Sequence, residues 1–430
     1  MSTLKAVRGT RDLLPPETAL WNRIETTARA VFARYNYGEI RTPVFEDTAL
    51  FARGVGEETD IVSKEMYTWE DRARAQSEKT QSLTLRPENT AGVVRAYIEH
   101  KLGETGQLQK LYYIGPQFRR ERPQKGRYRQ FSQIGAEVIG PPSSGSESSL
   151  RDAEVLEMLA TLLDELGITG WTLHINSVGS AADRARYNET LREALIPLAP
   201  KMCVDCQRRA VTNPLRVLDC KVPEDQPIIE TLPKIADSLA EDSKQHFAAV
   251  TAALDAAGVA YRRNHRLVRG LDYYTRTTFE FTHGGLGAQN ALLGGGRYDG
   301  LSEAIGGPKA PGIGFAMGED RLVLTLQAQE AALAQLGHAY IAPLGEAMNP
   351  AALALARELR RAGLTVELGD GSFRLKKSFD AAEKTARRIV ILGEDELASG
   401  ILTVKEFATG IQTRVPHAEL TAVLSRPAGE

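Results

Sequence analysis

The sequence predicts an α+β protein, in which an antiparallel sheet flanked by helices carries a helical insertion and is followed by a separate α/β domain. Three observations predict this architecture. Strands follow one another around residues 111–139 and 278–317, whereas a doubly wound parallel sheet would alternate strands with helices. Residues 176–262 are rich in helix and alanine and interrupt the strand-bearing parts. After about residue 334, short strands alternate with helices, as in α/β domains.

The elements of the first domain follow from hydrophobic spacing. Apolar residues recur at helical spacing over residues 17–36, which predicts an amphipathic helix, and a strand is expected at 40–45. Residues 111–118 and 131–139 are predicted strands, and the charged segment between them contains proline and glycine. This pattern is typical of an antiparallel hairpin with a long, basic tip. A helix is expected at 150–166.

The later elements are shorter. Strands are predicted at 278–283, 290–293 and 312–317, and Glu319 and Asp320 then open a helix, since acidic residues favour a first turn. The C-terminal domain has three short strands that alternate with two helices. These elements are expected at 340–343, 349–362, 365–368, 374–386 and 388–392.

Composition excludes several classes of protein. With 42% hydrophobic and 25% charged residues, the chain is typical of globular proteins, and 430 residues suggest two or three domains. Three cysteines argue against a disulfide scaffold, and no apolar run reaches membrane-spanning length. Residues 1–14 carry charges and lack the apolar core of a signal peptide, so we expect a cytoplasmic protein without membrane contact. The net charge of −2 means that any nucleic acid would be bound by local basic patches.

The arginine-rich segment 118–133 has the clearest chemical character. It places six basic residues and one acid within about a dozen positions. The arginine side chain suits bidentate contacts to phosphate, and Phe131 could stack on a base. A solvated hairpin tip, or a nucleic-acid patch without catalysis, would explain the same composition.

Two other segments combine unusual residues. Residues 267–280 are apolar and aromatic, yet they carry Arg269 and two adjacent tyrosines, and buried charges are costly unless paired or used. A core strand with an ordinary ion pair is the alternative. Residues 293–301 contain three consecutive glycines, which allow close approach of a backbone or ligand. The chain has no GxxxxGK[ST] phosphate loop.

Polar residues also stand at two junctions between a strand and a helix. Glu88 and Thr90 follow a proline at the first junction, where helix capping is the simpler interpretation. Arg321 lies in the first turn of the helix that follows the glycine-flanked strand 312–317. It is either a surface residue or a phosphate contact beside the positive helix end.

These segments, in this order, resemble the class II aminoacyl-tRNA synthetases, and specifically the histidyl-tRNA synthetases. Residues 118–133 resemble the second motif of the class, and residues 312–324 the third. Pro43 with Glu46 resembles the first motif, which belongs to the dimer interface.

The segments 267–280 and 293–301 resemble the pair peculiar to the histidine enzymes. The resemblance covers nearly the whole chain, from the sequence RGTRD at residues 8–12 onwards. It implies a class II catalytic domain over residues 1–325, with the helical insertion at about 176–262. A linker at 326–336 and a C-terminal anticodon-binding domain at 337–430 would follow.

The activity implied by the resemblance is ATP-dependent conversion of histidine to histidyl-adenylate, followed by transfer to the 3′ end of tRNA(His). Arg119 and Arg269 would be the catalytic residues, on two sides of the α-phosphate. The implied ATP-binding residues are Arg119, Arg127, Phe131 and Arg321, with Mg²⁺ on the β- and γ-phosphates. The implied histidine-binding residues are Glu88, Asn89, Thr90, Arg119, Gln133, Glu137, Arg269, Tyr273 and Tyr274.

Within that set, Glu137 and Tyr274 match the residues that bond the two imidazole nitrogens. A site built in this way rejects analogues by ~10⁴-fold or more, so no editing domain is required. Asn89 stands where the family more often has glycine, a small change beside the pocket.

The resemblance further implies contacts to tRNA and a homodimer. Arg122 and Gln124 would face the acceptor end from the hairpin tip. The candidate anticodon-domain contacts are Phe373, Arg374, Lys376 and Lys377. A solvated helix face would explain these last charges equally well.

The cysteines form a metal-like pattern, because Cys203 and Cys206 are spaced as CxxC and Cys220 follows fourteen residues later. No fourth ligand is obvious from the sequence, which favours free thiols over zinc, so we assign no metal site.

Three alternatives compete with a synthetase for histidine. A catalytically silent paralogue serves as regulatory subunit of ATP phosphoribosyltransferase, but it lacks the anticodon domain and typically loses catalytic arginines. Here Arg119, Arg269 and Arg321 are all present. Residues 267–274 argue against a prolyl or threonyl enzyme, and a plain RNA-binding protein would have no use for ATP-site residues.

Overall fold

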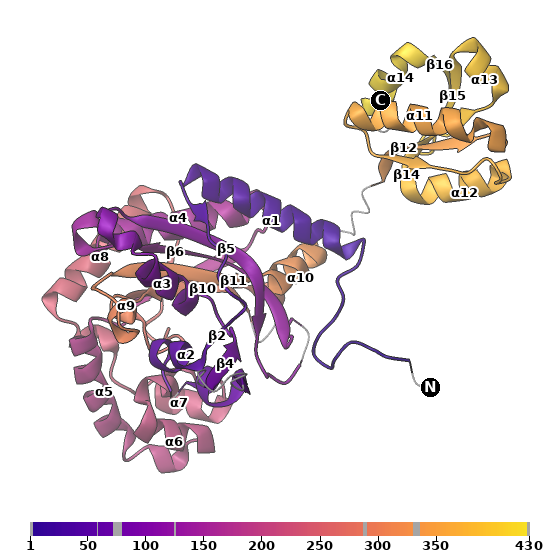
Figure 1. Cartoon of the computed structure of the whole chain (residues 1–430). Helices are drawn as coiled ribbons and strands as arrows, with labels where there is room; N and C mark the ends of the chain where they lie inside the picture. Colours follow the sequence, from indigo (N-terminus) through magenta and orange to yellow (C-terminus); the bar gives the residue numbers. More distant parts are fainter. Residues whose placement is uncertain are drawn as a thin grey trace. The chain divides into compact units, whose positions relative to one another are not determined.

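The computed structural model describes residues 3–57, 59–71, 80–123, 126–286, 290–329 and 336–427. The chain divides into two compact units, Met1–Ala331 and Ala332–Glu430, and each is built around its own sheet (Figure 1). Within the described residues, no helix is long and apolar enough to cross a membrane.

An eight-stranded sheet forms the centre of the first unit. In spatial order, its strands are β1 (Gly38–Glu39), β5 (Gln109–Phe118), β6 (Gln130–Ile139), β11 (Gly312–Gly318), β10 (Ala291–Arg297), β9 (Thr275–His283), β7 (Trp171–Ser177) and β8 (Arg262–Arg263). The six central strands pair antiparallel, whereas β1 pairs with β5, and β8 with β7, in parallel. The predicted α+β class is confirmed, and the two short edge strands make the sheet mixed.

Four helices pack on one face of this sheet. They are α1 (Glu17–Arg34), α4 (Ser149–Glu165), α8 (Glu241–Ala256) and α10 (Glu319–Gln329). The buried side of α1 consists of the five residues whose spacing predicted the helix, namely Trp21, Ile24, Ala28, Val31 and Phe32. Because side chains alternate across a strand, Ile134, Ala136 and Val138 of β6 join this core. Gln133 and Glu137 therefore face the opposite side of the sheet.

Shorter elements lie between β1 and β5. A three-stranded sheet contains β2 (Phe45–Asp47), β4 (Gln81–Leu85) and β3 (Tyr67–Asp71), accompanied by α2 (Thr48–Val55), the π-helix η1 (Ile61–Glu65) and α3 (Thr90–Glu99). The predicted strand at 40–45 is wrong in extent, since residues 40–44 connect β1 to β2. Pro43 in this connection has no N–H to give to a strand ladder.

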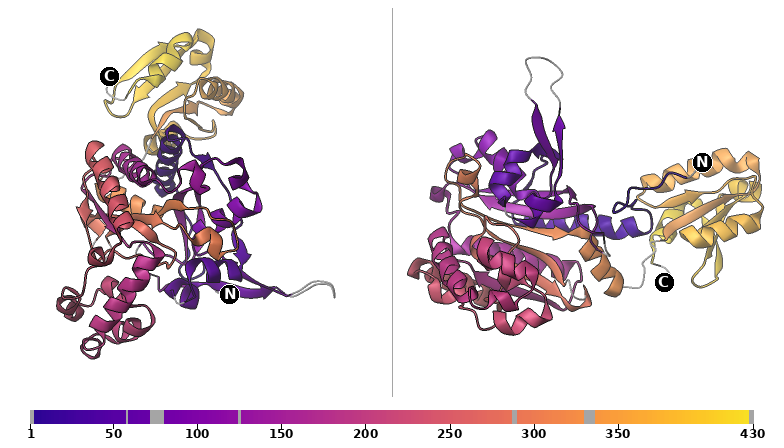
Figure 2. Two further views of the ribbon diagram at one scale, coloured as in Figure 1. Left: turned by 90° about the vertical axis from the view of Figure 1, so that its left-hand side faces the viewer. Right: turned by 90° about the horizontal axis from the view of Figure 1, so that it is seen from below.

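A group of helices with its own core forms the insertion. Its elements are α5 (Ala181–Leu195), η4 (Ala199–Lys201), α6 (Val204–Thr212), η5 (Pro214–Asp219), η6 (Pro223–Asp225), α7 (Gln226–Ile229) and η7 (Ile235–Ser238). This core contains buried residues from Val178 to Leu239, whereas the apolar residues of β7 and α8 belong to the core of the main sheet. In Figures 1 and 2, the insertion, in magenta and pink, lies across the sheet from α1.

The second unit contains a five-stranded sheet. Its strands, in spatial order, are β13 (Val366–Leu368), β12 (Gly337–Pro343), β14 (Ala386–Leu392), β15 (Ile401–Glu406) and β16 (Gln412–Pro416). Its helices are α11 (Asn349–Arg361), α12 (Leu375–Thr385), α13 (Glu394–Ser399) and α14 (His417–Ser425). The three predicted strands and two predicted helices are present. The elements after β14 were not predicted from the sequence. The remaining short helices of the chain are η2 (Leu102–Thr105), η3 (Pro142–Ser144), η8 (Gly284–Leu286), α9 (Leu301–Ala304) and η9 (Glu346–Met348).

One buried acid in the first unit predicts a pH-dependent stability. Glu319, the first residue of α10, is only 1% exposed, and burial raises the pKa of its carboxyl from 4.5 to about 8, with the charges of Glu25 and Asp320 acting in the same direction. Between these two pH values the folded chain retains a proton that the unfolded chain releases. The free energy of unfolding therefore falls as the pH rises through this window.

Glu319→Gln removes this titration. When the pH is raised from 5 to 8.5, the free energy of unfolding of the variant should therefore improve by roughly 1–3 kcal/mol relative to that of the parent. Urea unfolding at the two pH values measures the change. Glu241→Gln is the matched control, because Glu241 also begins a helix but is exposed. An equal gain in both variants, or none in Glu319→Gln, would contradict this account.

Candidate active site

A cavity of about 220 Å³ opens on the face of the large sheet opposite α1. The start of α3, the hairpin of β5 and β6, the segment before β9, the strands β10 and β11, and the start of α10 all contribute to its wall. Ten of the residues singled out in the sequence line it. They are Glu88, Thr90, Arg119, Arg127, Phe131, Gln133, Arg269, Tyr273, Tyr274 and Arg321.

The arginines of the hairpin are fixed by neutral and acidic partners. Arg119 Nε donates to the carbonyl oxygen of Pro87 at 2.9 Å, and its guanidinium carbon lies 5.2 Å from the centre of the Phe131 ring. Glu121, the single acid of the segment, accepts from Arg127 Nη1 at 3.0 Å and lies 3.9 Å from Arg119 Nη1. One carboxylate thus stands between two of the cationic groups that line the cavity.

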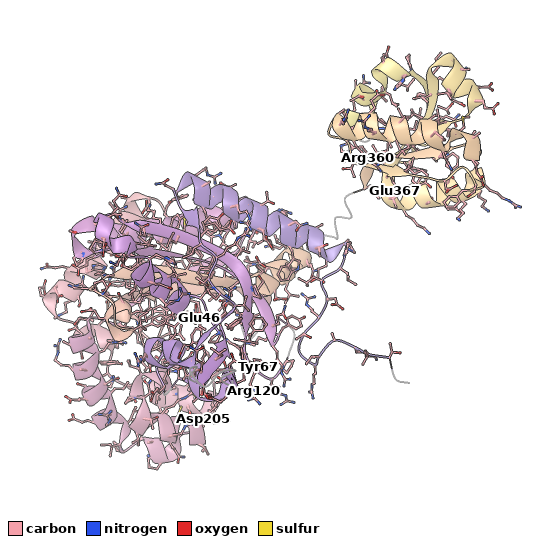
Figure 3. The ribbon with its side chains drawn as sticks, in the orientation of Figure 1. Glu46, Tyr67, Arg120, Asp205, Arg360 and Glu367 are labelled. Atoms are coloured by element: carbon pink, nitrogen blue, oxygen red, sulfur yellow. The ribbon has the colours of Figure 1, made fainter. Side chains whose placement is uncertain are left out.

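Neighbouring segments support this hairpin from outside. Arg129 N donates to the carbonyl oxygen of Gly9 at 2.7 Å, and a Cβ on Gly9 would lie 2.7 Å from the Arg129 side chain. Arg120 does not line the cavity, and its guanidinium carbon lies 5.8 Å from the ring centre of Tyr67, close to which Figure 3 shows it. The RGTRD segment and β3 therefore brace the base of the hairpin.

The glycine-rich strand β10 makes room for two of the site residues. A Cβ on Gly294 would lie 2.5 Å from the guanidinium atoms of Arg269, and a Cβ on Gly296 would lie 2.8 Å from the Tyr274 ring. Contacts this short do not occur for real side chains, so only glycine permits the observed packing. Arg269 also donates to Glu280 of β9, which orients its guanidinium group.

Glu88 joins the site to the start of α3. Its carboxylate accepts from the backbone N–H groups of Thr90 at 2.7 Å and Ala91 at 3.0 Å, which is a helix-capping arrangement. The capping interpretation of this residue and its place in the cavity wall are therefore compatible. Asn89, by contrast, does not line the cavity, because its Oδ1 accepts from the Thr42 hydroxyl at 2.6 Å.

Glu137 is fully buried directly behind the cavity wall. Its Oε1 accepts from the Thr90 hydroxyl at 2.7 Å, while its Oε2 has no hydrogen-bond partner among the described residues. Burial raises the pKa of Glu137 to about 8, and the charge of Glu88 acts in the same direction. Gln133 Oε1 likewise has no partner within the described part of the chain. Gln133 in the cavity wall and Glu137 behind it thus each have a buried oxygen without a hydrogen-bond partner in the described part of the chain.

Positive charge concentrates around Arg321 in the cavity wall. Burial lowers the pKa of Arg321, and the cationic groups of Arg127 and Arg269 act in the same direction. Arg321 Nη1 donates to the carbonyl oxygen of Ala291 and so is held in the wall. Like charges gathered in this way favour a polyanionic ligand.

The remaining predicted residues lie elsewhere. Arg122 is exposed in the hairpin tip, and Gln124 falls outside the described residues. Arg374, at the N-cap of α12, and Lys376 are exposed, while Lys377 Nζ lies 3.5 Å from the centre of the half-buried Phe373 ring. These four side chains gather at the start of α12 in the second unit.

Several lining residues were not singled out from the sequence. They are Tyr113, Glu121, Gly126, Tyr128, Leu271, Ala291, Leu292, Leu293, Phe315, Ala316 and Gly318. Gly294 and Asp320 also line the cavity, although the sequence indicated them only as part of a glycine run and as a helix start. Tyr113 pairs with Gly135 on β6, but the sequence does not reveal that register. Glu121 could have been predicted as a partner of the arginines, because it is the only acid among the six basic residues of segment 118–133.

Comparisons with known proteins identify the family of the chain. The family model described as histidyl-tRNA synthetase matches residues 9–322, and an anticodon binding domain matches residues 338–426. A histidine–tRNA ligase of Koribacter versatilis (strain Ellin345) is 73% identical over 97% of this chain and 95% of its own length. One from Solibacter usitatus (strain Ellin6076) is 57% identical over 98% of this chain and 99% of its own length.

A solved structure supports the same relationship. The chain resembles the apo histidyl-tRNA synthetase of S. aureus with a TM-score of 0.78 and 37% identity, over 99% of this chain and 100% of that one. The family match spans the sheet, the cavity and the insertion, and the relatives span nearly the whole sequence. The chain therefore belongs to the histidyl-tRNA synthetase family.

Proposed function

We propose that the chain is a histidine–tRNA ligase that activates L-histidine with ATP and transfers the histidyl group to the 3′ end of tRNA(His). The observation that carries this proposal is that one cavity combines four arginines with the buried Gln133 oxygen and lies in front of the buried Glu137 oxygen, neither of which has a hydrogen-bond partner in the described part of the chain. The arginines suit a triphosphate, whereas the two oxygens suit the N–H groups of an amino acid and its side chain.

In this proposal, Arg119 and Arg269 hold the α-phosphate, and Arg321 with Arg127 holds the γ-phosphate. Phe131 stacks on the adenine ring, next to the Arg119 guanidinium that already packs against it. Mg²⁺ enters as part of the substrate, on the β- and γ-phosphates. Fixed arginines stabilise the negative charge that develops at the α-phosphate without reorganising during the reaction.

For the amino acid, Glu88, Thr90 and Gln133 hold the α-amino group of histidine. Glu137 and Tyr274 bond the two imidazole nitrogens, with Tyr273 packed against Tyr274 at a ring-centre distance of 4.7 Å. Asn89 supports this pocket from outside through Thr42. A ligand without the two ring nitrogens would leave the buried Glu137 oxygen without a partner.

The arrangement places the histidine carboxylate beside the α-phosphate. The carboxylate oxygen attacks the α-phosphorus, the bond to the β-phosphate oxygen breaks, and diphosphate leaves. A hydroxyl of the terminal ribose of tRNA(His) then attacks the histidyl carbonyl carbon, and AMP leaves. Arg122 and Gln124 at the hairpin tip contact the acceptor end.

The C-terminal unit supplies the second tRNA contact in this proposal. The exposed Arg374 and Lys376, with Lys377 and Phe373, form a basic and aromatic group at the start of α12 that suits RNA backbone and bases. The proposed division of the chain is a catalytic domain, predicted at 1–325 and extending to the end of α10 at Gln329, a linker up to 336 and an anticodon-binding domain at 337–430. We also place the enzyme in the cytoplasm, where tRNA is charged.

A homodimer completes the proposal. In and beside β2, Val44 and Phe45 are 37% and 53% exposed, and Trp69 of β3 is 40% exposed. The ring centres of Phe45 and Trp69 lie 6.1 Å apart, so they form one apolar patch. This patch adjoins Pro43 and Glu46, and its burial against a second copy would remove apolar surface from water.

The test is histidine-dependent exchange of labelled diphosphate into ATP, measured with each of the twenty amino acids. We expect exchange with histidine alone, and exchange with no amino acid would contradict the enzyme assignment. The alternative is the regulatory subunit of ATP phosphoribosyltransferase, which would give no exchange. The convergence of four arginines on the cavity argues against that alternative, because a silent paralogue has no use for them.

Gly294→Ala tests whether β10 sets the position of Arg269. The new Cβ would lie 2.5 Å from the guanidinium group and must displace it, so exchange should fall by roughly 10–10²-fold. Gly300→Ala is the matched control, since it lies in the same glycine-rich segment with no atom near its Cβ position. Similar losses in both variants, or full activity in Gly294→Ala, would count against this role of the strand.

A further inference from the structure

The insertion brings together four side chains with soft or anionic ligand atoms. Cys203, Cys206, Cys220 and Asp225 each contribute one such atom, and all four atoms lie within 4.8 Å of one another. Cys206, Cys220 and Asp225 are buried, and Cys203 is half-buried. We propose that these residues form a structural zinc site, with three thiolate ligands and one carboxylate.

The local fold presents the four ligands from two turns. Cys203 is the N-cap of α6 and Cys206 lies in its first turn, so the CxxC spacing directs both sulfurs to one side. Cys220 directly follows η5, and Asp225 ends η6. The fourth ligand that the sequence did not reveal is therefore a carboxylate, brought back to the thiols by these two short helices.

The distances match tetrahedral zinc better than a disulfide. The Cys203 and Cys220 Sγ atoms are 3.9 Å apart, and two sulfurs bound to one tetrahedral zinc at about 2.3 Å lie about 3.8 Å apart. A disulfide would need about 2.05 Å and would leave the third thiol unused. Cys220 Sγ lies 3.2 Å from Asp225 Oδ2, which is a suitable separation for two ligands of the same ion.

The surroundings support the charged groups that such a site needs. The backbone N–H of Cys203 donates to Asp225 Oδ1 at 3.0 Å and that of Val222 donates to Cys220 Sγ at 3.4 Å. The N-terminus of α6 adds its partial positive charge. Asp225 is only 1% exposed, and hydrogen bonds from the Cys203 N–H and the Cys220 thiol hold its carboxylate in place beside the sulfurs. Bound zinc would take the place of the thiol proton at this carboxylate.

The site would fix the part of the insertion that contacts the segment before β9. Asn213, between α6 and η5, donates from Nδ2 to Asp272 Oδ1 at 3.2 Å, and Arg209 Nη2 lies 3.6 Å from Asp60 Oδ2. Asp272 precedes Tyr273 and Tyr274 in the segment that carries Arg269. A zinc ion that holds the start of α6 to the end of η5 would therefore stabilise the support of this segment.

Metal content of the full chain, purified without a polyhistidine tag from zinc-supplemented cells, tests the site. After dialysis against metal-free buffer we expect about one zinc per chain, and Cys220→Ser and Asp225→Asn should retain less than roughly a third of it. Asp205→Asn is the matched control and should remain near the parent value. Asp205, which is labelled in Figure 3, lies inside the CxxC segment, but it is exposed and is not one of the four clustered residues.

Cobalt uptake by the metal-stripped parent gives a second measurement that does not depend on how a variant folds. We expect thiolate-to-cobalt charge transfer and the d–d bands of a tetrahedral centre. Zinc below roughly one tenth per chain together with no such bands would overturn the proposal, as would equal zinc loss in Asp205→Asn and Cys220→Ser. Metal content is independent of aminoacylation, so failure of this site leaves the proposed activity untouched.

Discussion

Replacing Arg269 by alanine is expected to lower histidine-dependent diphosphate exchange by roughly 10²–10³-fold or more, while ATP binding largely survives. The reason is that Arg269 is oriented before substrate arrives, by Glu280 and by the space above Gly294. A preorganised cation beside the reacting phosphate stabilises the transition state more than the bound substrate. The main effect should therefore appear in kcat of exchange and only weakly in the dissociation constant of ATP.

Arg266→Ala is a suitable control for this experiment. Arg266 lies three residues earlier but points to the insertion, where it bonds Glu230 and Gln226, and it does not line the cavity. It should retain exchange within a few-fold of the parent. Near-parental exchange in Arg269→Ala would refute the assigned role, and a large loss of ATP binding would show that the residue acts on the ground state instead.

Glu137→Gln should weaken histidine binding by roughly 10–10²-fold and leave ATP binding nearly unchanged, because one charged hydrogen bond to the imidazole is lost. Glutamine keeps the shape of the side chain and a carbonyl oxygen for the Thr90 hydroxyl, so the fold should be retained. Calorimetric titration with histidine and with ATP separates the two effects. Equal losses for both ligands would argue against the placement of Glu137 at the imidazole.

The pH dependence of histidine binding provides an independent readout of Glu137. Its pKa of about 8 in the ligand-free chain lies above the imidazole pKa of about 6.5, so one proton is available to the pair between these values. Below about pH 6.5, the imidazole of free histidine carries an extra proton, which must be released when histidine binds. Above about pH 8, Glu137 has lost the proton that it would share with the imidazole. Affinity should therefore be highest between pH 6.5 and 8 and fall by up to about tenfold per pH unit on either side.

Glu137→Gln should lose the alkaline decline and keep the acidic one, since only the imidazole of histidine still titrates. Titrations between pH 5.5 and pH 9 compare the two limbs. An alkaline decline that persists in the variant would show that another group causes it.

Long periodic elements were predictable from the sequence, as α1 shows. Its five buried residues follow the helical period, and the strands of the β5–β6 hairpin were placed to within two residues. The two-residue strands β1 and β8 were not predictable, because so short a segment has no period and is ordered by its neighbour alone.

The site shows a similar division. The three glycines of β10 indicated that a ligand or another part of the chain lies close to this strand. The sequence could not show that the close neighbours are the side chains of Arg269 and Tyr274. Asp225 was missed because its position five residues after Cys220 matches no standard ligand spacing, and two short helices place it. Contacts between distant segments depend on tertiary packing, which local residue patterns do not encode.

Glu121 gives the arginines of the cavity an internal counter-ion. Its carboxylate lies 3.0 Å from Arg127 Nη1 and 3.9 Å from Arg119 Nη1, the two arginines that the proposed function assigns to the phosphates. An incoming nucleotide would then displace the Glu121 carboxylate from the arginines, instead of binding to arginines that have no counter-ion. A single inorganic phosphate competes poorly with a tethered carboxylate, whereas a triphosphate that reaches several arginines at once can displace it. The hairpin would in this way discriminate against the abundant small anions of the cell before any base or amino acid is recognised.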